Sequence, residues 1–240
     1  DYGAAADLRD NRIWGNTTGI RTTVAGSTQG LVFFHGAGSN EIYANSTGIQ
    51  AVGAQFQNQW VRNNSTGVTG TGIVGGSSLD LANRIEANQQ GIANFNGTVQ
   101  YSRIACNTTG IAATNGLLVA HNLVYRNTGV GLLVSGVSDV RIYQNTFYAP
   151  AGDNIRVQSA ASNVEVRGNI LWARAGYDLF VANDSQTGFF SDYNNLYADQ
   201  GGRIGYWTRD FTDVLDWQAD IARFDLHSIG ATVVNPHWAE

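Results

Sequence analysis

The stretch NRIWGNTTGI, residues 11–20, returns three times as NEIYANSTGI from Asn40, NRIEANQQGI from Asn83 and SRIACNTTGI from Ser102. Each copy starts with a polar turn residue, places an apolar residue two positions later, and ends on a second Asn followed by Gly and Ile. A fifth copy, NQWVRNNSTGV from Asn58, carries one inserted residue. Looser copies begin at Asn122, Asn145, Asn169 and Asn195. The period is about 23 residues, which is typical of solenoids.

The residue types explain how one repeat becomes one coil. Asn and Gly adopt left-handed turn conformations at the least cost, and β-branched residues suit the strands between turns. Coils stacked at the strand spacing of ~4.8 Å bring equivalent Asn side chains within hydrogen-bonding reach. We therefore predict an all-β chain, a right-handed parallel β-helix of about nine rungs with three strands per coil. Its first turns should form a stacked ladder of Asn11, Asn40, Asn58, Asn83, Ser102, Asn122, Asn145, Asn169 and Asn194.

The apolar positions predict two buried columns. The first is expected to contain Ile13, Ile42, Trp60, Ile85, Ile104, Val124, Phe147, Leu171 and Leu196. The second is expected to contain Ile20, Ile49, Val68, Ile92, Ile111, Ile155, Leu179 and Ile204. A leucine-rich repeat, the main alternative, would need Leu at most core positions and a helical segment in each coil, and neither pattern is present.

The two ends of the chain differ in pattern. Residues 1–204 carry the coils, whereas 205–240 are predicted to form a cap in which Thr212 starts a short helix with Val214, Trp217 and Ile221 on one face. The first coil, Leu8 to Thr22, has no comparable amphipathic cover, and open strand edges invite pairing. We expect contact there with another chain, or with preceding coils of a longer protein from which this chain was excised.

The coil motif resembles the right-handed parallel β-helix proteins of the pectate-lyase-like superfamily, and the resemblance covers residues 8–204. The bacterial extracellular branch of that superfamily is similar in its closing segment to SDYNNLY at 191–197, Trp217, DLHS at 225–228 and Pro236. The resemblance implies the fold and an extracellular or cell-surface location. It does not choose an activity, because members include lyases, hydrolases, epimerases, adhesins and modules without known activity.

Composition excludes several classes of function. The net charge is −5 and the pI is about 5.3, which gives no basic footprint for nucleic acid. No apolar run is long enough to insert into a membrane. The single cysteine, Cys106, rules out an internal disulfide.

The search for catalytic residues gives one weak cluster. The motifs shared by β-helix polygalacturonases (NTD, DD, GHG and RIK) do not occur, and all 14 cationic residues are Arg. A lyase or epimerase acting on acidic glycans needs a base, an acid and a group that neutralises the uronate carboxylate. Arg141, Glu165 and Arg167, together with Tyr143 and Arg156, are the best candidates for these roles. An ordinary solvated sheet face is the simpler interpretation of the same Arg–Glu alternation.

No cofactor or metal site is indicated. The four histidines, His35, His121, His227 and His237, lack metal-ligand spacing, although a single Ca²⁺ bound in a turn stays open. Asn-x-Ser/Thr sequons begin at Asn16, Asn45, Asn63, Asn64, Asn96, Asn107 and Asn183, four of them in the repeat turn. Turn geometry explains these four, and glycosylation depends on the source cell.

One residue beyond each inward position, the chain reads Trp14, Tyr43, Val61, Glu86, Ala105, Tyr125, Tyr148, Trp172 and Tyr197. Because successive strand residues point to opposite faces, these residues should form an outward column. The last four are aromatic and provide a candidate platform for sugar rings. The alternative, which we favour, is that Phe211, Trp217 or Phe224 of the C-terminal segment folds back and covers them.

These patterns leave three hypotheses. The first is a non-catalytic extracellular module with a structural, adhesive or glycan-contacting role in a larger surface or secreted protein. The second is a polysaccharide lyase or epimerase. The third is an assembly subunit that self-associates through its first coil.

Overall fold

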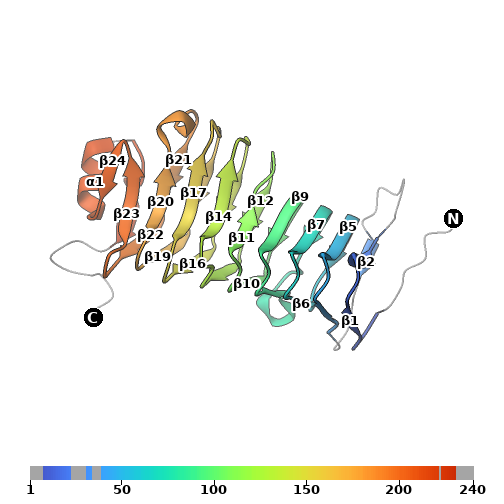
Figure 1. Ribbon diagram of the computed structural model, residues 1–240. Coiled ribbons are helices and arrows are strands. Elements are labelled where there is room, and N and C mark those ends of the chain that lie inside the picture. The colour runs from blue at the N-terminus through green and yellow to red at the C-terminus, as the bar shows by residue number, and fades with distance from the viewer. Residues whose placement is uncertain (1–7, 23–30, 34–38, 222, 231–240) are drawn as a thin grey trace.

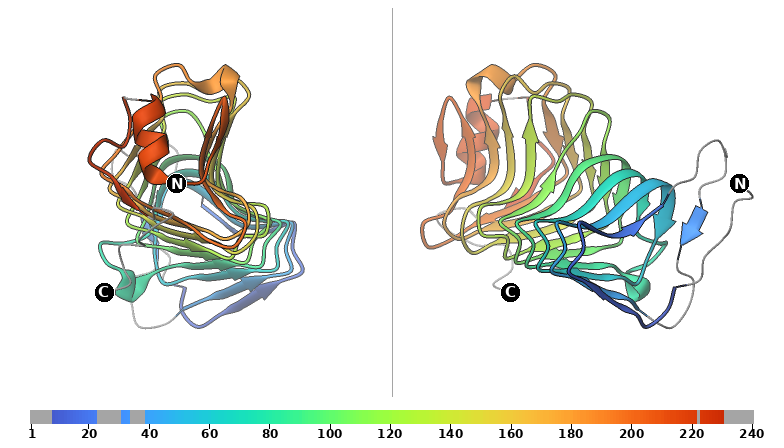
Figure 2. Two further views of the ribbon diagram at one scale, coloured as in Figure 1. Left: turned by 90° about the vertical axis from the view of Figure 1, so that its left-hand side faces the viewer. Right: turned by 45° about the vertical axis from the view of Figure 1, so that its right-hand side comes forward.

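The protein is all-β, as seen in a computed structural model (Figure 1). The structure describes residues 8–22, 31–33, 39–221 and 223–230. Two long sheets of mainly parallel strands run along a solenoid-like stack, and the left view of Figure 2 shows the coils one behind another with a progressive offset. The α-helix of the described residues, α1 (Val214–Ile221), lies at the C-terminal end of the stack (Figure 1). The described residues also include two short 3₁₀ helices, Leu79–Leu81 and Asn183–Ser185.

The first sheet takes one short strand from each coil. In the described residues it has ten strands, all parallel, and each strand pairs with the equivalent strand of the next coil. In spatial order these are β1 (Arg12–Trp14), β4 (Glu41–Tyr43), β6 (Trp60–Arg62), β8 (Arg84–Glu86), β10 (Arg103–Ala105), β13 (Leu123–Tyr125), β16 (Thr146–Ala149), β19 (Ile170–Ala173), β22 (Asn195–Ala198) and β25 (Ile229–Gly230).

The second sheet has fifteen described strands and two arms. One arm holds β2 (Thr18–Arg21), β11 (Thr109–Ala112), β14 (Val130–Ser135), β17 (Asp153–Gln158), β20 (Tyr177–Val181), β23 (Arg203–Trp207) and the antiparallel β24 (Arg209–Phe211). The other arm holds β3 (Leu31–Phe33), β12 (Leu118–Ala120), β15 (Arg141–Tyr143), β18 (Glu165–Arg167) and β21 (Phe190–Asp192). Three long strands, β5 (Thr47–Phe56), β7 (Thr66–Val74) and β9 (Gln90–Gln100), cross both arms. From Arg103 to Asp192, each coil therefore contributes three separate strands.

The first apolar column is buried as predicted apart from two members, Trp60 and the partly buried Ile13 of the first coil. Ile42, Val61 and Ile85 are direct partners in β4, β6 and β8, and none of the three is exposed. Val61 therefore takes the inward position that we assigned to Trp60. The extra residue in the fifth copy shifts the register by one, which turns Trp60 to the outer face.

The second column stays in register from Ile20 to Leu179, but its predicted last member is displaced. Leu179 pairs with Gly205 instead of Ile204, although Ile204 is also buried. A Cβ on Gly205 would lie 2.5 Å from Cζ3 of Trp217. Glycine at this position therefore makes room for the indole that closes the end of the core.

The predicted side-chain ladder is confirmed at eight of its nine positions. Asn122, Asn145 and Asn169 show its rule, because the Nδ2 of each donates to the Oδ1 of the next at 3.0 Å. The backbone N–H of each residue donates to that same oxygen at 2.9 Å. Asn58 is wrong, because Gln59 takes the ladder position and accepts from Asn40 at 2.8 Å. A second ladder consists of Asn16, Asn45, Asn64, Asn88, Asn107 and Asn127.

Asn58 fails because turn conformation and ladder position belong to neighbouring residues. The residue before most ladder positions has a left-handed φ, and Asn58 holds this place with φ 58°. Ala82, which precedes Asn83, is an exception with φ −61°. Asn is favourable in the left-handed conformation, so Asn58 correctly indicated a turn. The ladder position, however, belongs to the next residue. The ladder asparagines are therefore selected for their amide groups and not for left-handed geometry.

The C-terminal end closes with residues that complete the first ladder. The Nδ2 of Asn194 donates to Asp225 Oδ1 at 3.0 Å, and its backbone N–H donates to Ser228 Oγ at 2.8 Å. The indole N–H of Trp217 reaches the other Asp225 oxygen at 2.8 Å. Asp213 caps α1, accepting from the N–H of Leu215 at 2.7 Å, so the predicted cap at Thr212 is off by one residue.

The predicted contact at the first coil, Leu8 to Thr22, stays a prediction. A cap formed by residues 1–7 would count against it, and those residues lie outside the described part of the chain.

Replacing a central ladder residue tests how much the ladder stabilises the fold. Asn145 is buried and holds Asn122 on one side and Asn169 on the other. We expect Asn145→Ala to lower the free energy of unfolding by about 3 kcal/mol, because it leaves buried donors and acceptors unpaired. The exposed Asn96→Ala should change it by less than about 0.5 kcal/mol. Urea unfolding followed by circular dichroism measures both, and equal effects would contradict a stabilising ladder.

Candidate functional site

The four predicted aromatic positions form a continuous outward column on the ten-stranded sheet. Tyr125, Tyr148, Trp172 and Tyr197 are successive register partners in β13, β16, β19 and β22. The rings of Tyr148 and Trp172 have centroids 4.9 Å apart at 53°, and those of Trp172 and Tyr197 are 5.6 Å apart at 67°. Trp172 is 40% exposed, and the other three are half-buried. The column therefore offers inclined ring faces to solvent.

Polar groups lie along one side of this column. The indole N–H of Trp172 donates to Asp199 at 3.2 Å, and an Arg174 Nη1 donates to the Tyr148 hydroxyl at 3.4 Å. A depression of about 270 Å³ lies on the other side, lined by Ile170, Leu171, Trp172 and Tyr197. Ile170 is 48% exposed. The surface combines an apolar strip with hydrogen-bonding groups, which is the composition of a polar-ligand contact site.

The expected cover over the column is wrong for the three residues that we named. Phe211, Trp217 and Phe224 are buried in the core at the C-terminal end. Trp217 packs edge-on against Phe211 at 5.2 Å, and Phe224 packs against Trp207 at 5.1 Å. The open end of the solenoid needs apolar cover more than the outer sheet face does, because bare core is more costly than an exposed aromatic ring. Residues 231–240 lie outside the described part.

The N-terminal half of the same column has a different chemistry. Trp14 stacks on Tyr43 with ring centroids 5.9 Å apart, and the guanidinium of Arg62 lies 4.7 Å from the Tyr43 centroid. Arg62 occupies the position that we assigned to Val61, for the same one-residue shift in register. Arg62, Glu86 and Ala105 therefore separate this aromatic pair from the four-residue column.

The charged candidates lie together on the second arm of the fifteen-stranded sheet. Arg141 faces Glu165 and Tyr143 faces Arg167 in the register of β15 and β18. Arg167 Nε pairs with Glu165 Oε1 at 2.6 Å, and the Tyr143 hydroxyl donates to the other Glu165 oxygen. Burial, followed by the hydrogen bond to Glu165 and its charge, raises the pKa of Tyr143 to about 12.

Arg156, which we had placed in this cluster, lies elsewhere. It sits in β17 on the other arm, where its Nε pairs with Asp153 at 2.6 Å and its guanidinium lies 3.8 Å from the centroid of the Phe180 ring. The alternation of residues along the strand predicted that Arg156 points outward, but it did not predict which arm of the sheet holds that strand. The two arms are joined by a bend whose position differs from coil to coil.

The cluster is better built to bind than to abstract a proton. A phenol with a pKa of about 12 is protonated at neutral pH, and its proton is already donated to Glu165. Arg167 is held in the ion pair with the same carboxylate. A general base needs an available lone pair, whereas the Tyr143 hydroxyl is protonated and the Arg167 guanidinium carries donors only.

A depression of about 400 Å³ adjoins this cluster. Its lining adds Gln144, Gly168 and Tyr193 to Tyr143, Glu165 and Arg167. Sequence reasoning missed the first three because they stand at the corner between sheets, where the strand alternation that directed the search does not apply. Their position immediately before Asn145, Asn169 and Asn194 was the available signal.

Tyr193 is held by a contact with the C-terminal segment. Its ring stacks on His227 at 4.9 Å and 8°. The imidazole Nδ1 and the backbone N–H of His227 both contact the carboxylate of Asp192, at 2.8 and 2.9 Å. Burial alone would raise the pKa of Asp192, but these hydrogen bonds and that of the Tyr193 N–H bring its pKa below the ordinary value.

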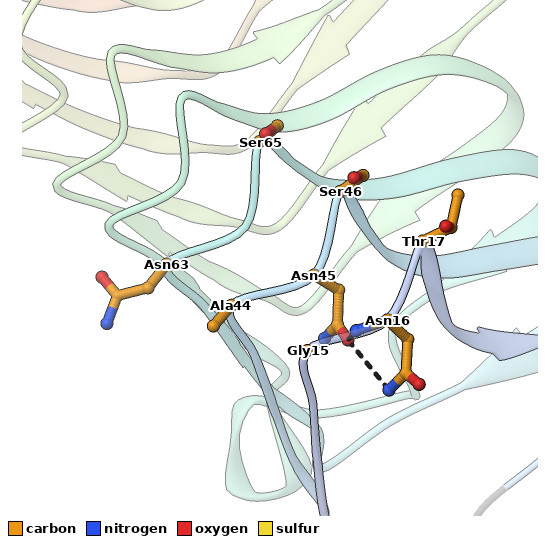
Figure 3. Close-up of a pocket in the computed structure, with 8 residues that line it drawn as sticks. All are labelled: Gly15, Asn16, Thr17, Ala44, Asn45, Ser46, Asn63 and Ser65. Carbon is orange, nitrogen blue, oxygen red and sulfur yellow. Dashed lines mark hydrogen bonds between the residues drawn. The ribbon is translucent and has the colours of Figure 1, made fainter.

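A depression of about 520 Å³ is lined by turn residues of the first coils (Figure 3). It is bordered by amides and hydroxyls such as Asn16, Thr17, Ser46, Asn63 and Ser65, with an Asn16–Asn45 hydrogen bond in its floor. None of these lining groups titrates near neutral pH, so this depression offers hydrogen bonds without acid–base chemistry.

The described residues contain no group of three His, Cys, Asp or Glu side chains arranged to hold a metal ion. Among them, too, no helix has the length and apolarity needed to cross a membrane. Three of the sequon asparagines, Asn45, Asn64 and Asn107, are buried ladder members. These three cannot carry a glycan in the folded protein.

Comparison of the chain with protein-family models, curated proteins and solved structures finds no match. The family resemblance of the coil motif therefore stays a proposal.

The Asp192–His227 contact gives a pH-dependent prediction. Because the pKa of Asp192 is lowered on folding, its contribution to stability is present above its ordinary value of 3.8 and is lost as the pH falls through the lowered value. We expect the difference in unfolding free energy between the wild type and Asp192→Asn to shrink between pH 5 and pH 3. Urea unfolding at a series of pH values measures it, and a difference that stays constant would contradict the assignment.

Proposed function

We propose that the chain is a right-handed parallel β-helix module of the pectate-lyase-like type that binds polysaccharide without cleaving it, outside the cell or at its surface. The coil motif, the parallel sheets and the two side-chain ladders support the fold. The aromatic column Tyr125–Tyr148–Trp172–Tyr197 is the proposed contact surface. The observation that carries the proposal is Trp172, 40% exposed in line with a tyrosine on either side.

The chemistry of the column matches that of a sugar chain. Pyranose rings have an apolar face of C–H groups and an equatorial rim of hydroxyls. Aromatic rings bury the first, while Asp199 and Arg174 can accept from and donate to the second. An exposed aromatic strip on a folded protein usually marks such a contact.

The direction of the column also favours a linear ligand. Its four residues come from four successive coils, so the column runs along the solenoid at ~4.8 Å per step. An extended glycan would lie across the strands, with its sugar units meeting rings from neighbouring coils. A single strand could not provide this repeat, because its side chains alternate between faces.

A lyase or epimerase that uses Arg141, Glu165 and Arg167 is the alternative function. Abstraction of the proton next to a uronate carboxylate requires an unprotonated base. In this cluster Tyr143 has a pKa of about 12 and Arg167 is paired with Glu165. Binding requires no change in the protonation of Tyr143 or in the Arg167–Glu165 ion pair, whereas proton abstraction requires one or both. Binding without cleavage is therefore the simpler explanation of the cluster.

Affinity electrophoresis in gels that contain cellulose derivatives, xylan, pectin or alginate tests the binding function. We expect at least one polysaccharide to retard the wild type, and Trp172→Ala to weaken its affinity about tenfold or more, equivalent to ~1.4 kcal/mol. Trp14→Ala is the matched control, since Trp14 is 57% exposed on the same sheet but separated from the four aromatic residues by Arg62, Glu86 and Ala105. Retardation by none of them, or equal losses in both variants, would contradict the proposal.

The alternative function has its own test. Incubation with pectin and alginate should release no unsaturated oligosaccharide, as measured by ultraviolet absorbance of the new double bond. Release that disappears in Arg167→Ala would replace the binding proposal with the lyase.

A further inference from the structure

A second column of side chains stands at the corner where each coil turns into the ten-stranded sheet. It consists of the residues that precede the first ladder, and in five successive coils these are Tyr101, His121, Gln144, Gly168 and Tyr193. All five have a left-handed φ, between 42° and 64°. Their side chains leave the corner in similar directions because their backbones and their ladder neighbours repeat. The spacing between them is one coil, ~4.8 Å.

Rings at adjacent corner positions stack on one another. Tyr101 and His121 lie with centroids 4.8 Å apart and planes at 9°. Tyr193 and His227 repeat this geometry at 4.9 Å and 8°. Aromatic side chains at adjacent corner positions are therefore stacked face to face, one from each coil.

Gly168 interrupts this column. A Cβ built on it would meet Gln144 Cγ at 3.4 Å, an ordinary contact, and has no closer neighbour. The position is thus open to a side chain but has none, and Gln144 and Tyr193 are separated there by two coil spacings, ~9.6 Å. The depression of about 400 Å³ lies at this gap, with Gln144, Gly168 and Tyr193 among its lining.

The walls of the gap differ in chemistry. One face of the Tyr193 ring is covered by His227, the residue is 57% exposed, and it lines the depression. Asp192 holds His227 through two contacts, which fixes the platform. Beside the gap, Glu165 and Arg167 present an acceptor and a donor 2.6 Å apart. Vicinal hydroxyls of a sugar can donate to the first while accepting from the second.

We propose that this gap, the Gly168 notch, binds a single pyranose unit of a neutral sugar, with its ring against Tyr193 and its hydroxyls on Glu165 and Arg167. The ligand takes the place of the missing side chain in the corner column. A neutral sugar fits because the two cations beside the gap, Arg141 and Arg167, are matched by two carboxylates, Glu165 and Asp192, which leaves no net positive charge for a carboxylate or sulfate. The notch shares no residue with the aromatic column, so it does not depend on the function proposed above.

Filling the notch tests the site without removing any group that lines it. Gly168→Tyr would continue the ring stack into the gap, and the corner already accepts Tyr at two positions with left-handed φ. Gly168→Ala is the matched control, because it has the same backbone cost but leaves most of the space open. Circular dichroism and thermal unfolding of both variants establish that the fold is retained.

Saturation-transfer difference NMR with the methyl glycosides of glucose, galactose and mannose provides the readout. We expect transfer from the wild type to at least one of them, retained within about threefold in Gly168→Ala and lost in Gly168→Tyr and Tyr193→Ala. Transfer that is lost in Trp172→Ala but kept in Gly168→Tyr would place the contact on the aromatic column and overturn the notch. No transfer to any of the three glycosides, or unchanged transfer with Gly168→Tyr, would overturn the site. Stronger binding of methyl galacturonide than of all three would overturn the neutral class.

Discussion

The hydrogen bond from one ladder amide to the next is the interaction on which the rest of this structure depends. Every ladder amide along Asn122, Asn145, Asn169 and Asn194 donates toward the C-terminus, so the ladder has a direction. Its last donors meet the carboxylate of Asp225, which is fully buried. A chain of aligned amides ends with its positive side outward, and an anion at that place satisfies the donors and the field together.

A fixed register turns single residues into columns. Because each ladder residue holds its coil one spacing from the next, any outward position repeats at the same place on every coil. The aromatic column and the corner column both arise in this way, although one lies on a flat sheet and the other at a turn. Binding surfaces in such a fold therefore depend on which side chains occupy equivalent positions in successive coils. They also depend on where a side chain is missing from such a column, as at Gly168.

Much of this was predictable from the sequence, and the failures have specific causes. Period-two alternation and the Asn–Gly turns identified the parallel coils and most ladder positions. The single insertion after Asn58 shifted Val61 and Arg62 by one place, because one residue reverses every side chain in a strand. Arg156 was assigned to the wrong arm, since bends between arms leave no periodic signal. The Gly168 notch depends on the absence of a side chain among neighbours distant in sequence, which only the coordinates bring together.

Hydrogen exchange of the asparagine side-chain amides, followed by ¹⁵N NMR, tests the central role of the ladder most directly. The Nδ2 hydrogens of Asn122, Asn145 and Asn169 are buried and hydrogen-bonded, so their exchange requires opening of the stack. We predict exchange about a hundredfold slower than that of the exposed Asn96, equivalent to ~2.7 kcal/mol of opening free energy. Exchange of the ladder amides at the rate of Asn96 would show that the stack does not hold the coils in register.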